Sequence, residues 1–112
     1  MQQEVELQPI LNALQKTSPD IEACAFVTLE GEVMAGTTGD ATNAFGPMLA
    51  KLAARTIETL DDEIDEVVLR GKNIHAVMMG SKAPRLLVLA KADAKLGLLR
   101  LEMKRALVTA EP

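Results

Sequence analysis

Apolar residues recur along the chain at two different spacings, and these spacings predict its helices and strands. Over residues 9–17 they lie three and four positions apart, which predicts an amphipathic helix that ends at Ser18-Pro19, because the residue before a proline disfavours helical geometry. Residues 21–29 are apolar on both sides of a strand pattern, which is typical of a central strand. Glu30-Gly31 predicts a tight turn, and residues 32–36 return as the second strand of a hairpin.

A second helix is predicted over residues 45–60, after a polar loop over residues 37–43. Asn43 or Gly46 is expected at its N-cap, with Pro47 in its first turn. Its apolar arc spans about 240° on a helical wheel, whereas slightly more than 100° is enough to cover one core face. The helix is therefore either buried on all sides or shared between its own sheet and a partner. In so short a chain, the other two helices and the strands cannot easily enclose the second helix on all sides. An association surface is therefore favoured.

The second half of the chain predicts a meander of strands followed by a last helix. Gly71-Lys72 is the expected two-residue hairpin turn, and a looser turn follows near Pro84. The last helix is expected over residues 94–109, with Asp93 at its N-cap. The pattern thus predicts one α/β domain of the α+β type over residues 1–112. The three strand-like runs of the meander are residues 64–70, 73–80 and 85–91.

Composition excludes several classes of protein. The net charge is −4, no cluster of Lys and Arg stands out, and the only aromatic residues are Phe26 and Phe45, so we expect no nucleic-acid partner. Cys24 is the single cysteine, which rules out an internal disulfide or a cysteine cage for a metal. No apolar run approaches the roughly 18 residues that span a bilayer, and no signal peptide is evident. We therefore expect a cytoplasmic protein without a membrane span.

Candidate catalytic and ligand-binding residues are few. His75 is the only histidine and sits in the middle of a predicted strand, so a polar residue in the sheet is favoured over a general base. The glycines at 36, 39 and 46 match no phosphate-binding fingerprint, and turn formation explains them. An acidic cluster lacks the glycine and spacing of a calcium loop and is expected to be solvent-exposed. We expect no enzymatic activity, cofactor or metal. The acidic cluster is Asp61, Asp62, Glu63, Asp65 and Glu66.

Two segments resemble the Roadblock/dynein light chain family, and within it the prokaryotic GTPase regulators. Residues 25–35 (AFVTLEGEVMA) are similar to its apolar strand, acidic-Gly turn and return strand, and residues 93–100 (DAKLGLLR) are similar to the opening of its last helix. The order of elements agrees along nearly the whole chain. The resemblance implies a Roadblock/profilin-like fold: a single five-stranded antiparallel sheet in the order 2-1-5-4-3 with three helices.

The same resemblance implies a function through partners. Family members bind or regulate small Ras-like GTPases, scaffold signalling complexes or serve motor complexes, and the family has no catalytic residue to carry over. We expect a non-catalytic homodimeric adaptor that binds a small Ras-like GTPase, or a heterodimer with a paralogue. Two alternatives stay open: a structural scaffold subunit without a GTPase partner, and a small-ligand sensor, which requires a pocket with convergent polar groups.

Interface residues follow from the wide apolar arc and from the family dimer, in which third strands pair and second helices pack together. Small residues such as Ala53 and Ala54 permit close approach, so an arginine at either position is expected to disrupt association more than folding. The polar strip of the second helix, Lys51, Arg55 and Glu58, is the expected partner-binding site. The expected dimer interface is Met48, Leu49, Ala50, Ala53, Ala54, Ile57, Val67, Val68 and Leu69.

Overall fold

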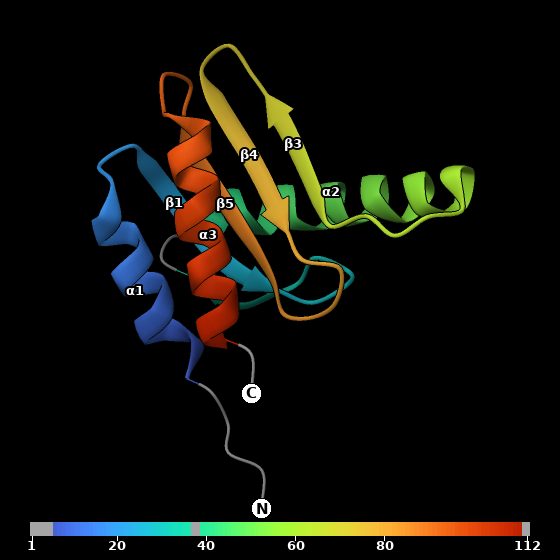
Figure 1. Ribbon diagram of the computed structural model, residues 1–112, viewed down its shortest axis with the longest axis horizontal. Helices are drawn as coiled ribbons and strands as arrows, with labels where there is room; N and C mark the ends of the chain where they lie inside the picture. Colours follow the sequence, from blue (N-terminus) through green and yellow to red (C-terminus); the bar gives the residue numbers. More distant parts are fainter. Residues whose placement is uncertain (1–5, 37–38, 111–112) are drawn as a thin grey trace, which may run out of the picture.

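The computed structural model describes residues 6–36 and 39–110, and for residues 39–43 it describes the backbone alone. Within these ranges, five strands form one antiparallel sheet and three helices pack on its two faces (Figure 1). The helices are α1 (Leu7–Thr17), α2 (Gly39–Leu60) and α3 (Leu96–Ala110). The strands are β1 (Ile21–Val27), β2 (Val33–Gly36), β3 (Glu66–Arg70), β4 (Ile74–Met79) and β5 (Arg85–Lys91).

The strand order is β2-β1-β5-β4-β3, and every neighbouring pair is antiparallel. This confirms the predicted five-stranded sheet and its order. The two strands with apolar residues on both sides, β1 and β5, lie in the interior of the sheet and are buried along nearly their whole length, as their pattern predicted. The edges are the short strand β2 and the half-exposed strand β3.

The sheet separates two apolar cores, because successive side chains of a strand point to opposite faces. Along β5, Leu86 and Val88 face α1 and α3, whereas Leu87 and Leu89 face α2. Figure 1 shows α1 and α3 side by side in front of the sheet, with α2 behind it. Central members of the first core are Leu11, Phe26 and Met103, and central members of the second core are Val27, Leu49 and Ala53.

The predicted start of the second helix is wrong. The helix α2 already begins at Gly39, so part of the expected polar loop is helical and Pro47 lies inside the helix rather than in its first turn. An interior proline removes a backbone hydrogen bond and costs about 3 kcal/mol. Phe45 and Leu49, on either side of Pro47, pack against the core under α2, and this packing offsets the cost. Residues 37 and 38 of the expected loop lie outside the described residues.

Several other boundaries differ from the prediction by one or two residues, among them the start of α1 and the end of β1, and two of the differences change a local assignment. The N–H of Gly71 donates to the carbonyl of Ile74 at 2.9 Å, so the two-residue loop of the β3–β4 hairpin is residues 72–73 rather than Gly71-Lys72. The helix α3 begins at Leu96, and the N–H of Leu99 donates to the carbonyl of Lys95 at 3.0 Å. Lys95, not Asp93, therefore occupies the N-cap position, and a separate turn over residues 91–94 precedes the helix.

The turn between β1 and β2 fixes the position of α2 on the sheet. Gly31 has a φ of +87°, and a side chain there would overlap the backbone carbonyl of Gly46 in α2. The two glycines thus let the turn and the helix touch backbone to backbone. This contact anchors the N-terminal half of α2 beside β1 and β2. The position of its C-terminal half then depends on the direction in which the helix crosses the sheet.

Candidate association surface

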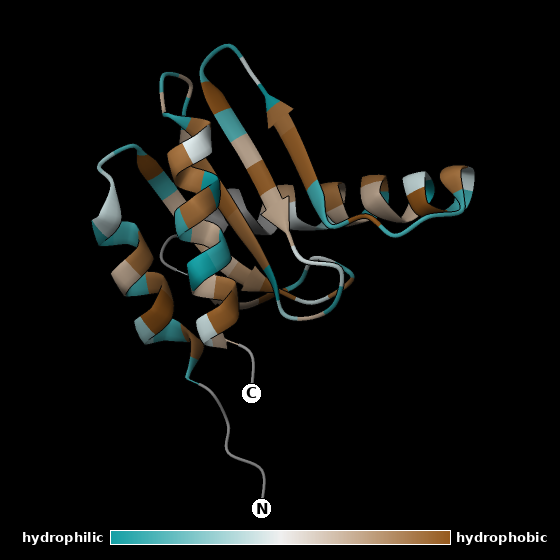
Figure 2. Ribbon diagram, in the orientation of Figure 1, coloured by the Kyte–Doolittle hydropathy of each residue, from teal (hydrophilic) through white to brown (hydrophobic). Residues whose placement is uncertain are grey.

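The C-terminal half of α2 extends past its own sheet. The helix packs on β1, β2 and β5, and Figure 1 shows its far end beyond β3, clear of the strands. Apolar residues recur along this part of the helix, as the brown segments of the ribbon in Figure 2 show. Leu60 is 63% exposed, Leu52 is also exposed and Ile57 is half-buried. The overhang is therefore an apolar helix end that the described part of the chain does not cover.

The strand nearest the overhang, β3, has one unpaired edge within the described residues, because it pairs with β4 alone. Val67 and Leu69 are half-buried and pack against the core under α2. Val68 lies on the opposite face, beside Val77, and is exposed. An apolar edge strand of this kind can add a strand from another chain. We call Leu52, Ile57, Leu60, Val67 and Leu69 the association surface.

Three of the residues expected at the dimer interface lie in the core of the chain itself. Leu49, Ala50 and Ala53 are almost fully buried, and Leu49 and Ala53 pack against the strands under α2. The burial of Ala53 argues against the expectation that Ala53→Arg disrupts association more than folding, because the charge would enter this core. Of the other expected residues on α2, Met48 and Ala54 are exposed. The wide apolar arc thus serves both purposes: one side covers the sheet and another is uncovered.

The expected partner-binding residues Lys51, Arg55 and Glu58 are all exposed on α2. Within the described residues, the ion pairs are Arg100–Glu66 at 2.7 Å and Arg105–Glu102 at 3.3 Å, so none of the three belongs to an ion pair there. Their side chains are thus accessible to another protein. Their role stays a prediction.

The single histidine and the single cysteine are both buried. His75 is on the face covered by α1 and α3, and its Nδ1 has no hydrogen-bond partner among the described residues. The Sγ atom of Cys24 contacts the carbonyl of Leu11 at 3.6 Å and Oε1 of Gln15 at 3.7 Å. Neither side chain is accessible to a substrate, so both fit the structural interpretation.

The acidic cluster after α2 is exposed, except that Glu66 is half-buried and accepts a hydrogen bond from Nε of Arg100 at 2.7 Å. Across residues 6–36 and 39–110, no three Asp, Glu, His or Cys side chains are grouped as metal ligands. In the same ranges, no helix is long and apolar enough to cross a bilayer.

Sequence reasoning missed one buried charge. Arg85 at the start of β5 is buried, pairs with Val27 across the sheet, and its Nε has no partner among the described residues. Burial lowers the pKa of its guanidinium, and the nearby carboxylate of Glu30 opposes that shift. The group stays charged, because an arginine pKa lies far above neutrality. The signal was present in the sequence, since Arg85 opens the apolar run of the most buried strand.

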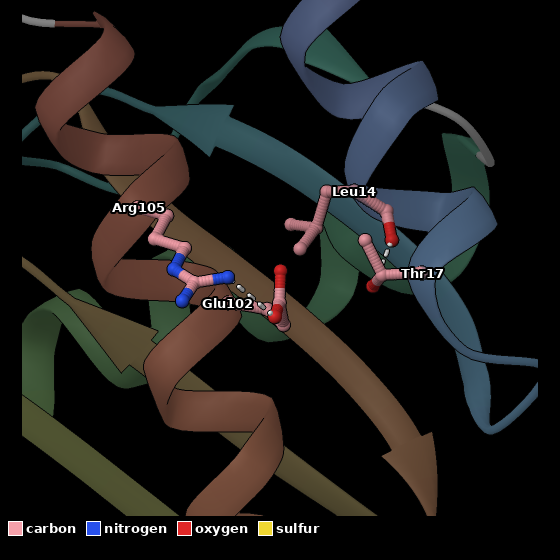
Figure 3. Close-up of polar contacts among 4 residues, drawn as sticks. All are labelled: Leu14, Thr17, Glu102 and Arg105. Carbon is pink, nitrogen blue, oxygen red and sulfur yellow. Dashed lines mark hydrogen bonds and ion pairs between the residues drawn. The ribbon is translucent and has the colours of Figure 1, made fainter.

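A shallow recess of about 380 Å³ lies between α1 and α3. Figure 3 shows that its polar groups already engage one another or the backbone: Arg105 pairs with Glu102, and Oγ1 of Thr17 donates to the carbonyl of Leu14 at 2.7 Å. A ligand site requires several polar groups that converge on one point. The recess does not have this arrangement, so it gives no support to the alternative of a small-ligand sensor.

Solved structures define the class of fold. The chain superposes on the Roadblock/LC7 domain from Streptomyces avermitilis with a TM-score of 0.80 and 16% identity over 93% of each chain. It matches the gliding protein MglB from Thermus thermophilus with a TM-score of 0.77 and 18% identity, over 91% of this chain and 83% of that one. A structure of MglB with a tetrameric arrangement gives 0.75 and 19%, over 91% and 83%.

The chain therefore has the Roadblock/LC7 fold, and the resemblance expected from the sequence is confirmed for the fold. At these identities the likeness concerns the fold alone. No protein-family model matches the sequence, and no curated protein matches it.

Proposed function

We propose that this chain is a non-catalytic, cytoplasmic adaptor that dimerises and binds a small Ras-like GTPase. One observation carries the proposal: α2 extends beyond its own sheet and leaves Leu52 and Leu60 uncovered. Contiguous apolar surface of this kind marks protein interfaces. The tetrameric arrangement of MglB, a protein of the same fold, supports self-association of such domains.

In the proposed dimer, the β3 strands of two copies pair antiparallel across a two-fold axis perpendicular to the sheet. This pairing satisfies the free edge of β3 and joins two five-stranded sheets into one of ten strands. Each α2 overhang then lies over the edge strand of the other copy, where Val67 and Leu69 are half-buried. The same contact forms twice, as in an isologous interface. A heterodimer with a paralogue of the same fold would use the same geometry.

The GTPase partner is proposed because the chain resembles the Roadblock family, whose regulatory members bind small Ras-like GTPases. Two-fold pairing brings the exposed strips of both α2 helices, Lys51, Arg55 and Glu58, into one surface for such a partner. Arg55 is the obvious candidate for an arginine finger, but such a finger has to extend into the nucleotide site. Arg55 lies inside the long helix α2, more than one turn before its end at Leu60, which supports binding without a catalytic contribution.

Titration calorimetry against a co-expressed Ras-like GTPase in its GDP and GTP-analogue states tests this function. We expect nucleotide-dependent binding that Arg55→Ala weakens by about 1 kcal/mol, as for a contact at the rim of an interface. An unchanged affinity with a thousandfold loss of GTP hydrolysis would overturn the non-catalytic assignment. Dimers that bind no GTPase in either nucleotide state would favour the alternative of a structural scaffold subunit.

A further inference from the structure

The last helix has a second apolar stripe on its outward side. Leu99, Met103 and Ala106 are buried against the sheet and α1, as expected for the inner side. On the outer side, Leu98 is 58% exposed, Leu101 is 46% exposed and Val108 is 68% exposed. Together with Arg105 these residues are spaced by three, four and three positions, the a/d spacing of a coiled coil. We call Leu98, Leu101, Arg105 and Val108 the outer seam.

The helix that carries the outer seam is basic, although the chain as a whole is acidic. From the N-cap to the end of α3 the charged residues are Lys95, Arg100, Lys104, Arg105 and one acid, Glu102, which gives four positive charges against one negative, a net of +3. Since the whole chain carries −4, the remainder carries −7. Positive charge is thus concentrated on the helix that also carries the uncovered stripe.

Arg105 can engage a partner without loss of a strong contact inside the chain. Its ion pair with Glu102 joins two side chains of the same helix at 3.3 Å, and the Arg105 side chain is 69% exposed. Exposed pairs of this kind contribute little to stability. Lys104, the residue before Arg105, is exposed as well. A carboxylate from another molecule would therefore meet two accessible cations beside the leucines.

We propose that the outer seam binds an acidic amphipathic α-helix of a partner protein. A narrow a/d stripe is the width of a helix–helix seam, and flanking charges of opposite sign select the partner. A parallel second copy of α3 would bring Arg105 and Lys104 against their own twins, and an antiparallel copy centred on the seam would bring Arg105 against Leu101 rather than against an acid. A lipid surface also fits poorly, because surface-lying helices insert a broad apolar face, commonly with aromatics, and Arg105 interrupts this stripe.

This site lies on the other side of the sheet from the association surface, since α3 and α2 cover opposite faces (Figure 1). A helix bound to the seam would not compete with a partner on α2. A perpendicular two-fold axis would also place both seams of a dimer on the same face, so one elongated partner can span them. Binding at the seam and dimerisation can therefore be measured separately.

The test uses a synthetic peptide of three heptads with leucine at a and d and glutamate at e and g, followed by fluorescence anisotropy. We expect the protein to bind it with a Kd on the order of 10 µM, and Leu101→Glu and Arg105→Glu each to weaken binding at least about tenfold. Leu29→Glu and Lys72→Glu are the matched controls, since both residues are exposed and lie outside α3. They should change the Kd less than about twofold.

Several results would overturn the proposal. One is that a peptide with lysine at e and g binds equally well, which would show that opposite charge does not select the partner. Another is no binding of the glutamate peptide by the folded protein at about 1 mM. Sedimentation with vesicles of phosphatidylserine and phosphatidylcholine that Leu101→Glu abolishes would assign the seam to lipid. A smaller oligomer in Leu101→Glu than in the wild type would assign it to self-association.

Discussion

At the residue scale, Ala53 and Ala54 are neighbours in sequence but lie in different surroundings. Ala53 is 1% exposed and packs between α2 and the sheet, whereas Ala54 is exposed. We expect Ala53→Arg to lower the free energy of unfolding by about 3 kcal/mol or more, because an unpaired charge enters a packed core. Urea denaturation monitored by circular dichroism measures this loss.

Ala54→Arg should keep a folded spectrum and affect association alone. Similar losses at both positions would mean that the helix packs with a different side toward the sheet.

Two glycines offer a second contrast at the same scale. Gly31 has a positive φ and no room for a side chain, whereas a Cβ at Gly97 would meet no atom within 4 Å beyond its chain neighbours and the backbone of its own helix. Gly31→Ala should destabilise the protein by about 2 kcal/mol, because backbone strain and overlap with α2 act together. Gly97→Ala should stabilise it by about 0.5–1 kcal/mol, since alanine favours a helix over glycine. Thermal unfolding of both variants decides this, and a destabilised Gly97→Ala would contradict it.

Residue burial on α2 was predicted only in part from the sequence. The helical wheel showed an arc too wide for one core face, and the structure has one covered and one uncovered apolar side. It did not show which alanine meets the sheet, because the contact between Gly31 and Gly46 sets the position of α2, and these residues are far apart in sequence. The burial of Arg85 was not predicted for the same reason, because the β1–β2 turn and the neighbouring strand form its surroundings.

At the scale of elements, strong periodicity located the strands to within two residues, whereas local signals located the starts of the helices poorly. The last strand occupies the predicted residues 85–91, and α1 ends at the predicted Thr17. The start of α2 was missed because Pro47 is a typical first-turn residue, and the tertiary packing of Phe45 that holds it inside the helix is not visible in sequence. The overhang could not be predicted from the sequence either, because it depends on the angle between α2 and the sheet.

The overhang and the edge strand make a prediction at this scale. Leu60→Glu and Val68→Lys should each convert the proposed dimer into a folded monomer, because both residues are exposed in the single chain. The glutamate puts a charge into apolar surface that the second copy covers, and the lysine opposes strand pairing at the β3 edge. Sedimentation velocity at about 50 µM, roughly fivefold above an expected Kd on the order of 10 µM, measures the mass. Leu29→Glu, another exposed leucine outside this surface, is the control and should stay dimeric. Wild-type protein of monomeric mass at this concentration would refute the proposed dimer.

At the scale of the whole molecule, dimerisation should couple to stability. A dimer that buries the overhang unfolds by separating into two chains, so its Tm should rise with protein concentration by mass action. Differential scanning calorimetry over a hundredfold range of concentration measures this dependence. Leu60→Glu should have a Tm that no longer changes with concentration. A concentration-independent Tm for the wild type would mean that the folded monomer needs no partner.

The position of the uncovered helix end beside an edge strand has a consequence for how such proteins diverge. In a symmetric pair every substitution on this surface is present twice, so a change that weakens one copy of the contact by about 1 kcal/mol weakens the pair by about 2 kcal/mol. After gene duplication a mixed pair carries the same change once and loses half as much. While the losses add, the exchange of two like pairs for two mixed pairs therefore stays neutral. A substitution that clashes with its own twin across the two-fold axis costs extra in the symmetric pair alone, and such a change favours the mixed pair.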